Sequence, residues 1–236
     1  MRIQALRDAD SVAEAGAKFT AAEARAAVAA RGRFILAVSG GHTPWKMLRA
    51  LADDEVPWAG VHLVQVDERV APEGHLDRNL THIRESLLDH CPLAPAQVHA
   101  MPVEAVDLNS AKEHYSQMLR EIAGSPAVLD LVHLGLGVDG HTASLVPGDP
   151  VLNVDRADVA ISQTYQGRRR MTLTYPILNR SRRILWLVTG KEKADALARL
   201  YAGDPSIPAG RINRHRSIVL ADQDAVAQTG LQLSHL

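Results

Sequence analysis

The stretch HLGLGVDGHTASLVPG, residues 133–148, decides the fold class and the kind of site that this sequence predicts. Its glycines have the G-x-G-x-x-G spacing of a dinucleotide-binding turn. Such a turn opens a long helix and is followed by an acidic residue at the end of the next strand. Here Pro147 and Pro150 prevent a long helix, and Asp158 precedes VAI instead of following an apolar strand. A nicotinamide-cofactor site is therefore disfavoured, and we expect a loop that delivers a histidine.

Outward from this stretch, apolar runs of strand length alternate with longer helix-like segments. The pattern is typical of a mostly parallel sheet that helices cover on both faces. Strands are predicted at 34–39, 61–66, 129–136, 184–190 and 217–221, with a weaker candidate at 171–174. Helices are predicted at 11–32, 43–53, 78–90, 109–124 and 191–203.

Residues that favour helix ends support these segments. Gly32, Gly124 and Gly203 stand where left-handed C-terminal caps are expected, and Asn109 stands where its side chain would cap a helix start. Pro44 suits a first helical turn, where its missing N–H costs nothing. Because no repeat or long linker divides the 236 residues, we expect a single domain over residues 1–236.

Composition excludes several classes of protein. Hydrophobic residues make up 46% and charged residues 22%, and the net charge is −1, so neither a nucleic-acid nor a membrane partner is expected. Cys91 is the only cysteine, which excludes an intrachain disulfide and favours a reducing compartment. The N-terminus has no signal-peptide core, and no apolar run reaches the ~18 residues of a membrane span. We expect a cytoplasmic protein; the sequence leaves its oligomeric state open, and a monomer is compatible with it.

The segment AVSGGHTPWKML, residues 37–48, runs from a predicted strand through a Ser-Gly-Gly turn into an amphipathic helix. Glycines let the backbone approach a ligand, and the helix start presents free N–H groups and a positive dipole. Ser39, Gly40, Gly41 and Thr43 are therefore predicted phosphate-binding residues, although the Lys of a Walker loop is missing. Two alternatives remain: a plain strand-to-helix turn, and the nucleophile elbow of a serine hydrolase, which normally follows several earlier strands.

Charged residues follow the next predicted strand in VQVDERVAPEGHLDRNL, residues 64–80. Ligands of an open parallel sheet bind beyond the carboxyl ends of its strands, so this loop is a candidate wall of the same pocket. Asp67 and Arg69 are predicted catalytic residues, and Asn79 is a predicted substrate-binding residue. The alternative is a surface loop with compensated charges.

The opening stretch brings Asp139 and His141 to this edge of the sheet. A histidine with the ordinary pKa of ~6.5 is largely neutral in the cytoplasm and can act as a general base. A lone histidine is more often structural, so the argument depends on three strand ends meeting at one pocket. No metal site is expected, because no short histidine pair such as H-E-x-x-H occurs. Further along, Arg170 and Lys193 can supply cations for an anion, whereas Arg168 and Arg169 fit a solvated loop.

Taken in order, SGGHTP, VDER with Asn79, GLGVDGHTASLVPG, RMTLTYP and LVTGKEKA resemble the 6-phosphogluconolactonases of the glucosamine-6-phosphate isomerase/6-phosphogluconolactonase family. The resemblance covers about residues 30–222, and DGHTASLxPG is its most specific part. It implies an open three-layer α/β/α fold, Rossmann-like, of the type found in glucosamine-6-phosphate deaminases and ribose-5-phosphate isomerases. It also implies hydrolysis of 6-phospho-D-glucono-1,5-lactone to 6-phosphogluconate, in the oxidative pentose phosphate pathway, without metal or organic cofactor.

By the same resemblance His141 is the general base, residues 39–43 form the phosphate loop, and Arg170 and Lys193 are basic pocket residues. The chain departs from the family pattern at Arg78 and Gly210, where serines are common. A deaminase-isomerase of the same fold is the main alternative, but it resembles DGHIAFNEP and DEY, where this chain reads DGHTASLVP and DER. A sugar-phosphate-binding regulator is a further alternative, although regulators usually carry an added DNA-binding domain.

Overall fold

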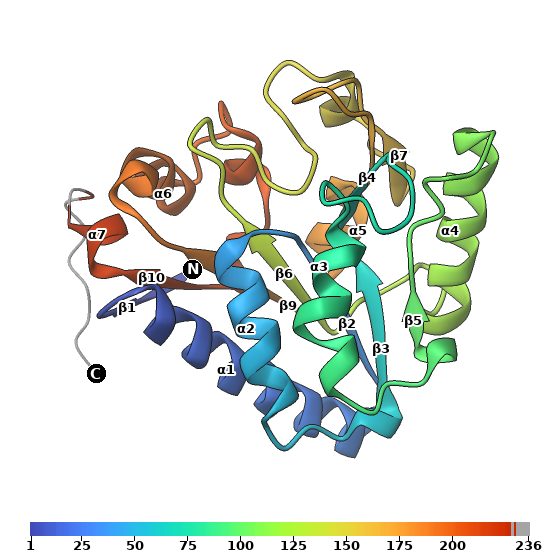
Figure 1. Cartoon of the computed structure of the whole chain (residues 1–236). Helices are drawn as coiled ribbons and strands as arrows, with labels where there is room; N and C mark the ends of the chain where they lie inside the picture. The colour runs from blue at the N-terminus through green and yellow to red at the C-terminus, as the bar shows by residue number, and fades with distance from the viewer. Residues whose placement is uncertain (228, 230–236) are drawn as a thin grey trace.

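The computed structural model describes residues 1–227 and 229. Its strands are β1 (Arg2–Leu6), β2 (Phe34–Val38), β3 (Val61–Gln65), β4 (Asp67–Arg69), β5 (Val98–His99), β6 (Leu131–Gly135), β7 (Val159–Ile161), β8 (Arg170–Leu173), β9 (Arg183–Val188) and β10 (Ser217–Asp222). Its α-helices are α1 (Ala9–Arg31), α2 (His42–Ala52), α3 (Asn79–Ser86), α4 (Leu108–Ala123), α5 (Tyr175–Arg180), α6 (Ala194–Ala202) and α7 (Gln223–Val226) (Figure 1). None of these helices combines the length and apolar character that crossing a membrane requires.

A seven-stranded sheet in the order β1-β10-β9-β6-β2-β3-β5 forms the centre of the molecule. Every neighbouring pair in it is parallel. Helices α1, α2 and α3 pack on one face, and α4, α5, α6 and α7 pack on the other. The predicted open three-layer α/β/α fold is therefore confirmed.

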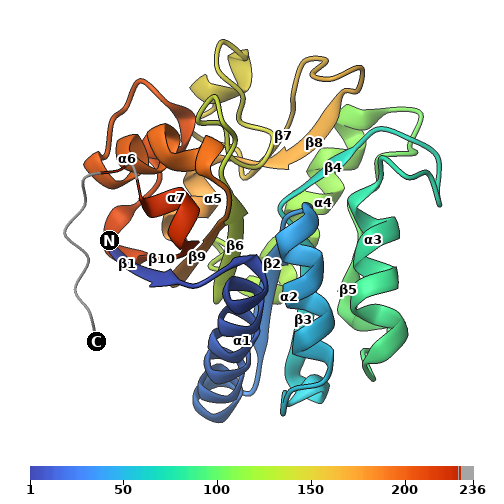
Figure 2. The same cartoon turned by 60° about the vertical axis from the view of Figure 1, so that its left-hand side comes forward.

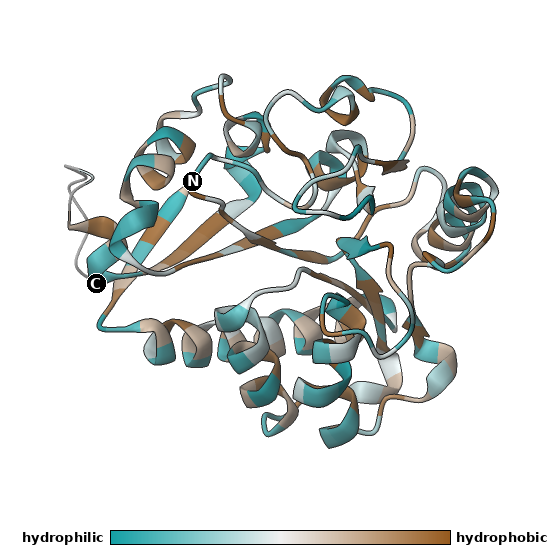
Figure 3. Cartoon of the chain, turned by 45° about the horizontal axis from the view of Figure 1, so that its top comes forward, coloured by the Kyte–Doolittle hydropathy of each residue, from teal (hydrophilic) through white to brown (hydrophobic). Residues whose placement is uncertain are grey.

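Strand β2 shows why the sequence has continuous apolar runs. All five of its residues are buried, and they alternate between the two cores: Leu36 packs with the α1–α2 side, whereas Ile35 and Ala37 pack with the α4 side. A strand that is covered on both faces has no polar side to present. In Figure 3 the central strands are accordingly largely hydrophobic, whereas the surrounding helices are hydrophilic on their outer surfaces.

The strand order reverses between β2 and β6. From β2 the chain proceeds to β3 on one side, whereas β6 leads to β9 and β10 on the other. Loops that leave the carboxyl ends of two such strands diverge and open a crevice, which is where open α/β sheets bind ligands. The loop after β2 contains residues 39–41, and the loop after β6 contains residues 136–141, so the two most informative motifs border this crevice.

A second, three-stranded sheet in the order β4-β8-β7 lies above that edge and is antiparallel (Figures 1 and 2). The segment Asp67–Arg69, predicted as a loop, is strand β4 of this sheet and pairs with β8. The edge strand β1 was not predicted either. Its residues are exposed or half-buried, unlike those of the central strands, because β1 lies at the edge of the sheet and only β10 pairs with it.

The structure confirms two of the predicted helix caps and corrects two others. Gly32 and Gly203 adopt the left-handed conformation as predicted. Gly124 has a φ of 88° but a ψ of 173°, so it turns the chain without forming a left-handed cap. Asp107, not Asn109, caps α4, because its carboxylate accepts the N–H of Asn109 at 2.9 Å.

Candidate active site

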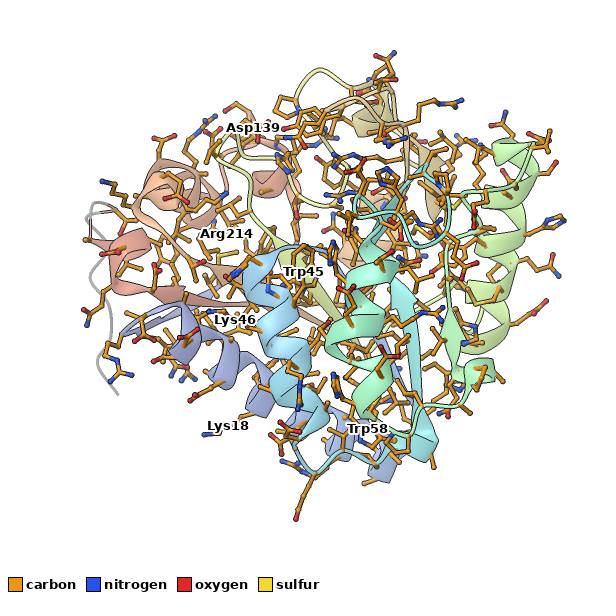
Figure 4. All side chains as sticks on the ribbon, in the orientation of Figure 1. Lys18, Trp45, Lys46, Trp58, Asp139 and Arg214 are labelled. Carbon is orange, nitrogen blue, oxygen red and sulfur yellow. The ribbon has the colours of Figure 1, made fainter. Side chains whose placement is uncertain are left out.

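A cleft of about 340 Å³ opens at the carboxyl edge of the sheet, at the reversal of strand order. Ten of the eleven predicted site residues line it: Ser39, Gly40, Gly41, Thr43, Asp67, Arg69, Asn79, His141, Arg170 and Lys193. The eleventh, Asp139, stands behind His141 and contacts its ring. Figure 4 places Asp139 among the loops at one end of the molecule and Trp58 at the opposite end.

The Ser-Gly-Gly turn places α2 against the cleft. Helix α2 begins at His42 after Gly41 and has no side-chain cap. Within the described residues, the main-chain N–H groups of Gly40 and Gly41 donate no hydrogen bond. Free N–H groups at a helix start are the usual means of holding an anion.

Ser39 lines the cleft, but its donors are already used inside the protein. Its hydroxyl donates to the main-chain oxygen of His133 at 3.0 Å, and its N–H donates to the His133 Nδ1 at 3.4 Å. His133 is fully buried, and burial lowers its pKa to about 3, so the ring is neutral and can accept. Ser39 therefore fixes the turn to β6, and the two glycines that follow carry the free donors.

Asn79 packs directly against this turn. A Cβ at residue 40 would lie 1.9 Å from the Asn79 Oδ1, so only glycine fits there. The Asn79 side chain donates to the main-chain oxygen of Asp67 at 2.9 Å, and within the described residues its Oδ1 has no partner. The Asp67 carboxylate also accepts the Ser144 hydroxyl at 2.6 Å, so the walls formed by β4, α3 and the loop after β6 are joined.

Glu68 organises this wall; the sequence placed it in the predicted wall of the pocket but gave it no role of its own. Its carboxylate is fully buried and accepts the N–H groups of Arg69 at 2.7 Å and of Asn79 and Leu80 at 2.8 Å. The last two belong to the first turn of α3, so Glu68 caps that helix. Arg78, also buried, brings its Nε to 3.2 Å from Glu68, off the line of a hydrogen bond, so the contact is ionic.

His141 and Asp139 form a pair at the other wall. The His141 Nδ1 lies 2.6 Å from the Asp139 Oδ1, which also accepts the His141 N–H at 3.1 Å. Burial opposes ionisation of Asp139, but these two hydrogen bonds hold its pKa below the ordinary value. The ionised carboxylate can only accept, so in the neutral form of the ring Nδ1 carries the proton and Nε2 has the lone pair. Residue 137 must be glycine, because a Cβ would lie 2.1 Å from the ring.

Two arginines face each other on the small sheet. Arg69 and Arg170 are direct partners across the β4–β8 pair, an arrangement that is unfavourable for like charges. Their Nε atoms are buried and have no partner within the described residues. Burial lowers the pKa of Arg170, while the nearby Asp67 carboxylate opposes that effect. Unpaired buried donors on cations are groups that an anionic ligand would satisfy.

The remaining cation enters from the β9 side of the cleft. Lys193 lies in the short 3₁₀-helix Lys191–Lys193 after β9. Thr189, the residue directly after β9, forms a 2.9 Å contact between its hydroxyl and that of Thr43 in α2. Glu192 lines the same part of the cleft. The Thr43 hydroxyl can still accept or donate one further bond.

The two departures from the family pattern have structural partners. Arg78 is the counter-ion of Glu68, as described above. Gly210 lies outside the cleft, and a Cβ there would meet the Asp204 main-chain oxygen at 1.9 Å. Its neighbour Ala209 donates an N–H to the Gly140 oxygen at 2.9 Å, so this segment supports the His141 loop from behind.

These features define an open α/β protein with a polar cleft at the carboxyl edge of its sheet. Within the described residues, no three His, Cys, Asp or Glu side chains gather as metal ligands would. The chain belongs to the family described as glucosamine-6-phosphate isomerases/6-phosphogluconolactonase, whose model matches residues 7–220.

Individual relatives agree with this assignment. The chain is 39% identical over 240 aligned residues to a 6-phosphogluconolactonase of Mycobacterium tuberculosis, with 96% of this chain and 97% of the relative covered. It is 37% identical to a 6-phosphogluconolactonase of Synechocystis, with 84% and 86% covered. The solved 6-phosphogluconolactonase of Thermotoga maritima superposes with a TM-score of 0.83 at 25% identity, covering 94% of this chain and 98% of that one. A monomeric glucosamine-6-phosphate deaminase has the same TM-score of 0.83 at 18% identity, which shows the fold alone.

Proposed function

We propose that this chain hydrolyses 6-phospho-D-glucono-1,5-lactone to 6-phosphogluconate, the activity named for its relatives. The observation on which the proposal rests is the His141–Asp139 pair at the edge of a cleft where, among the described residues, two arginine Nε atoms and two main-chain N–H groups have no partner. A phosphorylated lactone needs both parts, because one end of the molecule is a dianion and the other is an ester that water attacks.

The proposed reaction begins with His141 as general base. Its Nε2 accepts a proton from a water molecule as that water attacks the lactone carbonyl carbon. Asp139 keeps the ring in the required tautomer and favours the imidazolium that forms. The tetrahedral intermediate then collapses, the bond to the ring oxygen breaks, and the imidazolium returns its proton to that oxygen. The products are the carboxylate and the hydroxyl of the open-chain acid, and a carboxyl proton is released to water.

The turn after β2 is the proposed phosphate anchor. The N–H groups of Gly40 and Gly41 would donate to the phosphate at the positive end of α2, with the hydroxyl of Thr43. Lys193 and Arg170 would supply balancing charge. The Ser39 hydroxyl is excluded as a donor in this arrangement, because its proton already serves His133.

Negative charge that develops on the carbonyl oxygen requires a hydrogen-bond donor, which β4 can supply. Arg69 fits this role, because its Nη1 is held by the main-chain oxygen of Asp77 at 2.6 Å while its Nε is free. Asp67 would orient Arg170 and bind substrate hydroxyl groups. Its own geometry is fixed by Ser144 and Asn79.

Replacing the base tests the proposal. His141→Asn should lower kcat by about 10²- to 10⁴-fold while leaving KM largely unchanged. The assay follows 6-phosphogluconate formation with the spontaneous hydrolysis subtracted. His114→Asn, an exposed histidine on α4, is the matched control and should keep full activity. Near-normal kcat in His141→Asn would refute the assignment of the base.

Two further assays separate the alternatives. Release of ammonia from glucosamine 6-phosphate would assign the chain to the deaminase branch of the family instead. Covalent labelling of Ser39 by a fluorophosphonate would favour the serine-hydrolase hypothesis. Against that hypothesis, the Ser39 hydroxyl donates to a main-chain oxygen and not to a histidine ring.

A further inference from the structure

The hairpin between β7 and β8 ends in a tight turn, and its Arg170 lines the cleft. Tyr165 donates its N–H to the Arg168 oxygen at 2.9 Å, and Arg168 returns a hydrogen bond to the Tyr165 oxygen at 3.3 Å. The two residues between them, Gln166 and Gly167, have φ values of 51° and 78°. Two consecutive positive φ angles are the mark of the type I′ turn, which matches the twist of a hairpin. The side chains on either side of the turn therefore project from a well-defined backbone.

The Tyr165 ring contacts both kinds of predicted site residue. Its centroid lies 5.6 Å from that of the His141 ring, in a T-shaped arrangement at 65°. The Arg170 guanidinium lies 5.0 Å from the Tyr165 centroid, over the ring, and its Nη2 donates to the Gln166 Oε1 at 3.2 Å. One aromatic side chain thus touches the proposed base and one of the proposed anion-binding cations.

The hairpin is tied to the segment between β4 and α3. The Arg168 Nε lies 2.9 Å from the Asp77 Oδ2, and the Asp77 main-chain oxygen accepts the Arg69 Nη1 at 2.6 Å. The hydrogen bond from Arg168 holds the pKa of Asp77 below its ordinary value. Because Arg69 and Arg168 meet at one residue, the position of the hairpin is coupled to the position of a cleft arginine.

We propose that Tyr165 is a positioning residue for the lactone hydrolysis, and that the Arg168–Asp77 pair keeps it in place; this inference rests on the proposed function above. Asp139 holds only the Nδ1 side of the His141 ring, and a ring held at one atom can still tilt away from the cleft. The edge-to-face contact with Tyr165 removes that freedom and aims Nε2 at the substrate. The same ring orders the Arg170 guanidinium for the anion.

Two substitutions at Tyr165 separate the ring from its hydroxyl. Tyr165→Phe keeps the aromatic contacts and should keep kcat and KM within about 2-fold of the parent. Tyr165→Leu keeps apolar cover but loses both contacts, and should lower kcat by about 3- to 10-fold, the range of a single aromatic contact. KM for the phosphorylated lactone should rise by about 2- to 5-fold because Arg170 loses its cation–π partner. Tyr201→Leu is the matched control, because Tyr201 stacks with Arg214, an arginine outside the cleft, at 5.9 Å.

A second readout does not depend on activity. The proton on the His141 Nδ1, identified in NMR spectra by its loss in His141→Asn, should exchange with water several-fold faster in Tyr165→Leu, because the ring opens more often. Arg168→Gln should give a smaller change in the same direction. Arg169→Gln, which removes the same charge from the same hairpin, should give none, since the exposed Arg169 side chain makes no hydrogen bond or ion pair within the described residues.

The outcomes distinguish the two proposals. If the parent chain does not hydrolyse the lactone, the proposed function fails, whatever happens at Tyr165. If the parent is active and Tyr165→Leu leaves both kcat and the Nδ1 proton exchange unchanged in a folded protein, the positioning role is overturned. A loss in Tyr165→Phe as large as in Tyr165→Leu also overturns it, because the effect would then belong to the hydroxyl.

Discussion

Replacing Glu68 by glutamine tests whether one buried carboxylate holds together the wall that carries Asn79 and Arg69. Glu68→Gln changes the shape of the side chain little but removes its charge. It also converts one of two accepting oxygens into a donor. The side chain is fully buried, so water cannot compensate for either change.

The magnitude follows from the partners of the two oxygens. Oε1 accepts N–H groups at 2.7 and 2.8 Å, and Oε2 accepts the Leu80 N–H and the Gln65 side-chain amide, both at 2.8 Å. Glutamine keeps one of these oxygens and points N–H groups at the donors of the other. It also removes the buried counter-ion of the Arg78 guanidinium, whose side chain is 4% exposed, and leaves only the exposed Glu104 carboxylate at 3.6 Å. Breaking a buried ion pair by removing one partner costs about 3–5 kcal/mol, so we expect that loss in the free energy of unfolding.

Urea unfolding followed by circular dichroism measures this loss, and the lactonase assay measures its effect on the cleft. Glu104→Gln is the matched control, because Glu104 faces the same Arg78 at 3.6 Å but its side chain is 52% exposed. A surface pair of this kind contributes about 0–1 kcal/mol. If Glu68→Gln destabilises the protein by less than 1 kcal/mol, Glu68 is not the centre of the wall and the reasoning is wrong.

Three further predictions follow from the same geometry. Asp139→Asn should lower kcat by at least about 10²-fold with little change in KM, because an amide 2.6 Å from Nδ1 favours the wrong tautomer of His141. A kcat of Asp139→Asn equal to that of the parent protein in the steady-state assay would contradict this prediction. Lys193→Met should raise KM for the phosphorylated lactone by about 10-fold or more and leave KM for an unphosphorylated lactone unchanged. Lys191→Met, at a residue outside the cleft, should leave both KM values unchanged. Burial holds the pKa of His133 at about 3 against an ordinary 6.5, so between these values the unfolded chain binds a proton that the folded chain excludes. Stability is therefore present above pH 6.5 and lost as the pH falls towards 3, by up to about 1.4 kcal/mol per unit, and urea titrations of His133→Gln should show a smaller slope.

The elements that the sequence predicted are those whose signal is local. The predicted strand at 34–39 is apolar over Phe34–Val38 because both faces of β2 are covered, and α2 follows from its amphipathic pattern and from Pro44. The loop that follows the strand predicted at 129–136 was placed correctly, because its glycines and prolines exclude a long helix. The single domain over residues 1–236, the cytoplasmic location and the absence of a cofactor stay predictions.

The elements that the sequence missed depend on partners far along the chain. Asp67–Arg69 is a strand only because β8, about a hundred residues later, pairs with it. Charged residues in a row otherwise indicate a solvated loop, and here the burial of Glu68 depends on Arg78 and on the first turn of α3. Tyr165 was missed for the same reason. Its neighbours Gln166 and Gly167 indicate a turn, but no local sequence pattern indicates that the Tyr165 ring contacts His141.

Several described residues that line the cleft have polar atoms without a hydrogen-bond partner, and together they argue for an anionic ligand more strongly than any single residue does. Along the wall behind the cleft, the Glu68 carboxylate accepts four N–H hydrogen bonds. Inside the cleft, Arg69 and Arg170 oppose each other with free Nε atoms, and Gly40 and Gly41 keep their N–H groups. Leaving them open costs stability in the free protein, and a bound phosphate and a developing oxyanion would recover that free energy during the reaction.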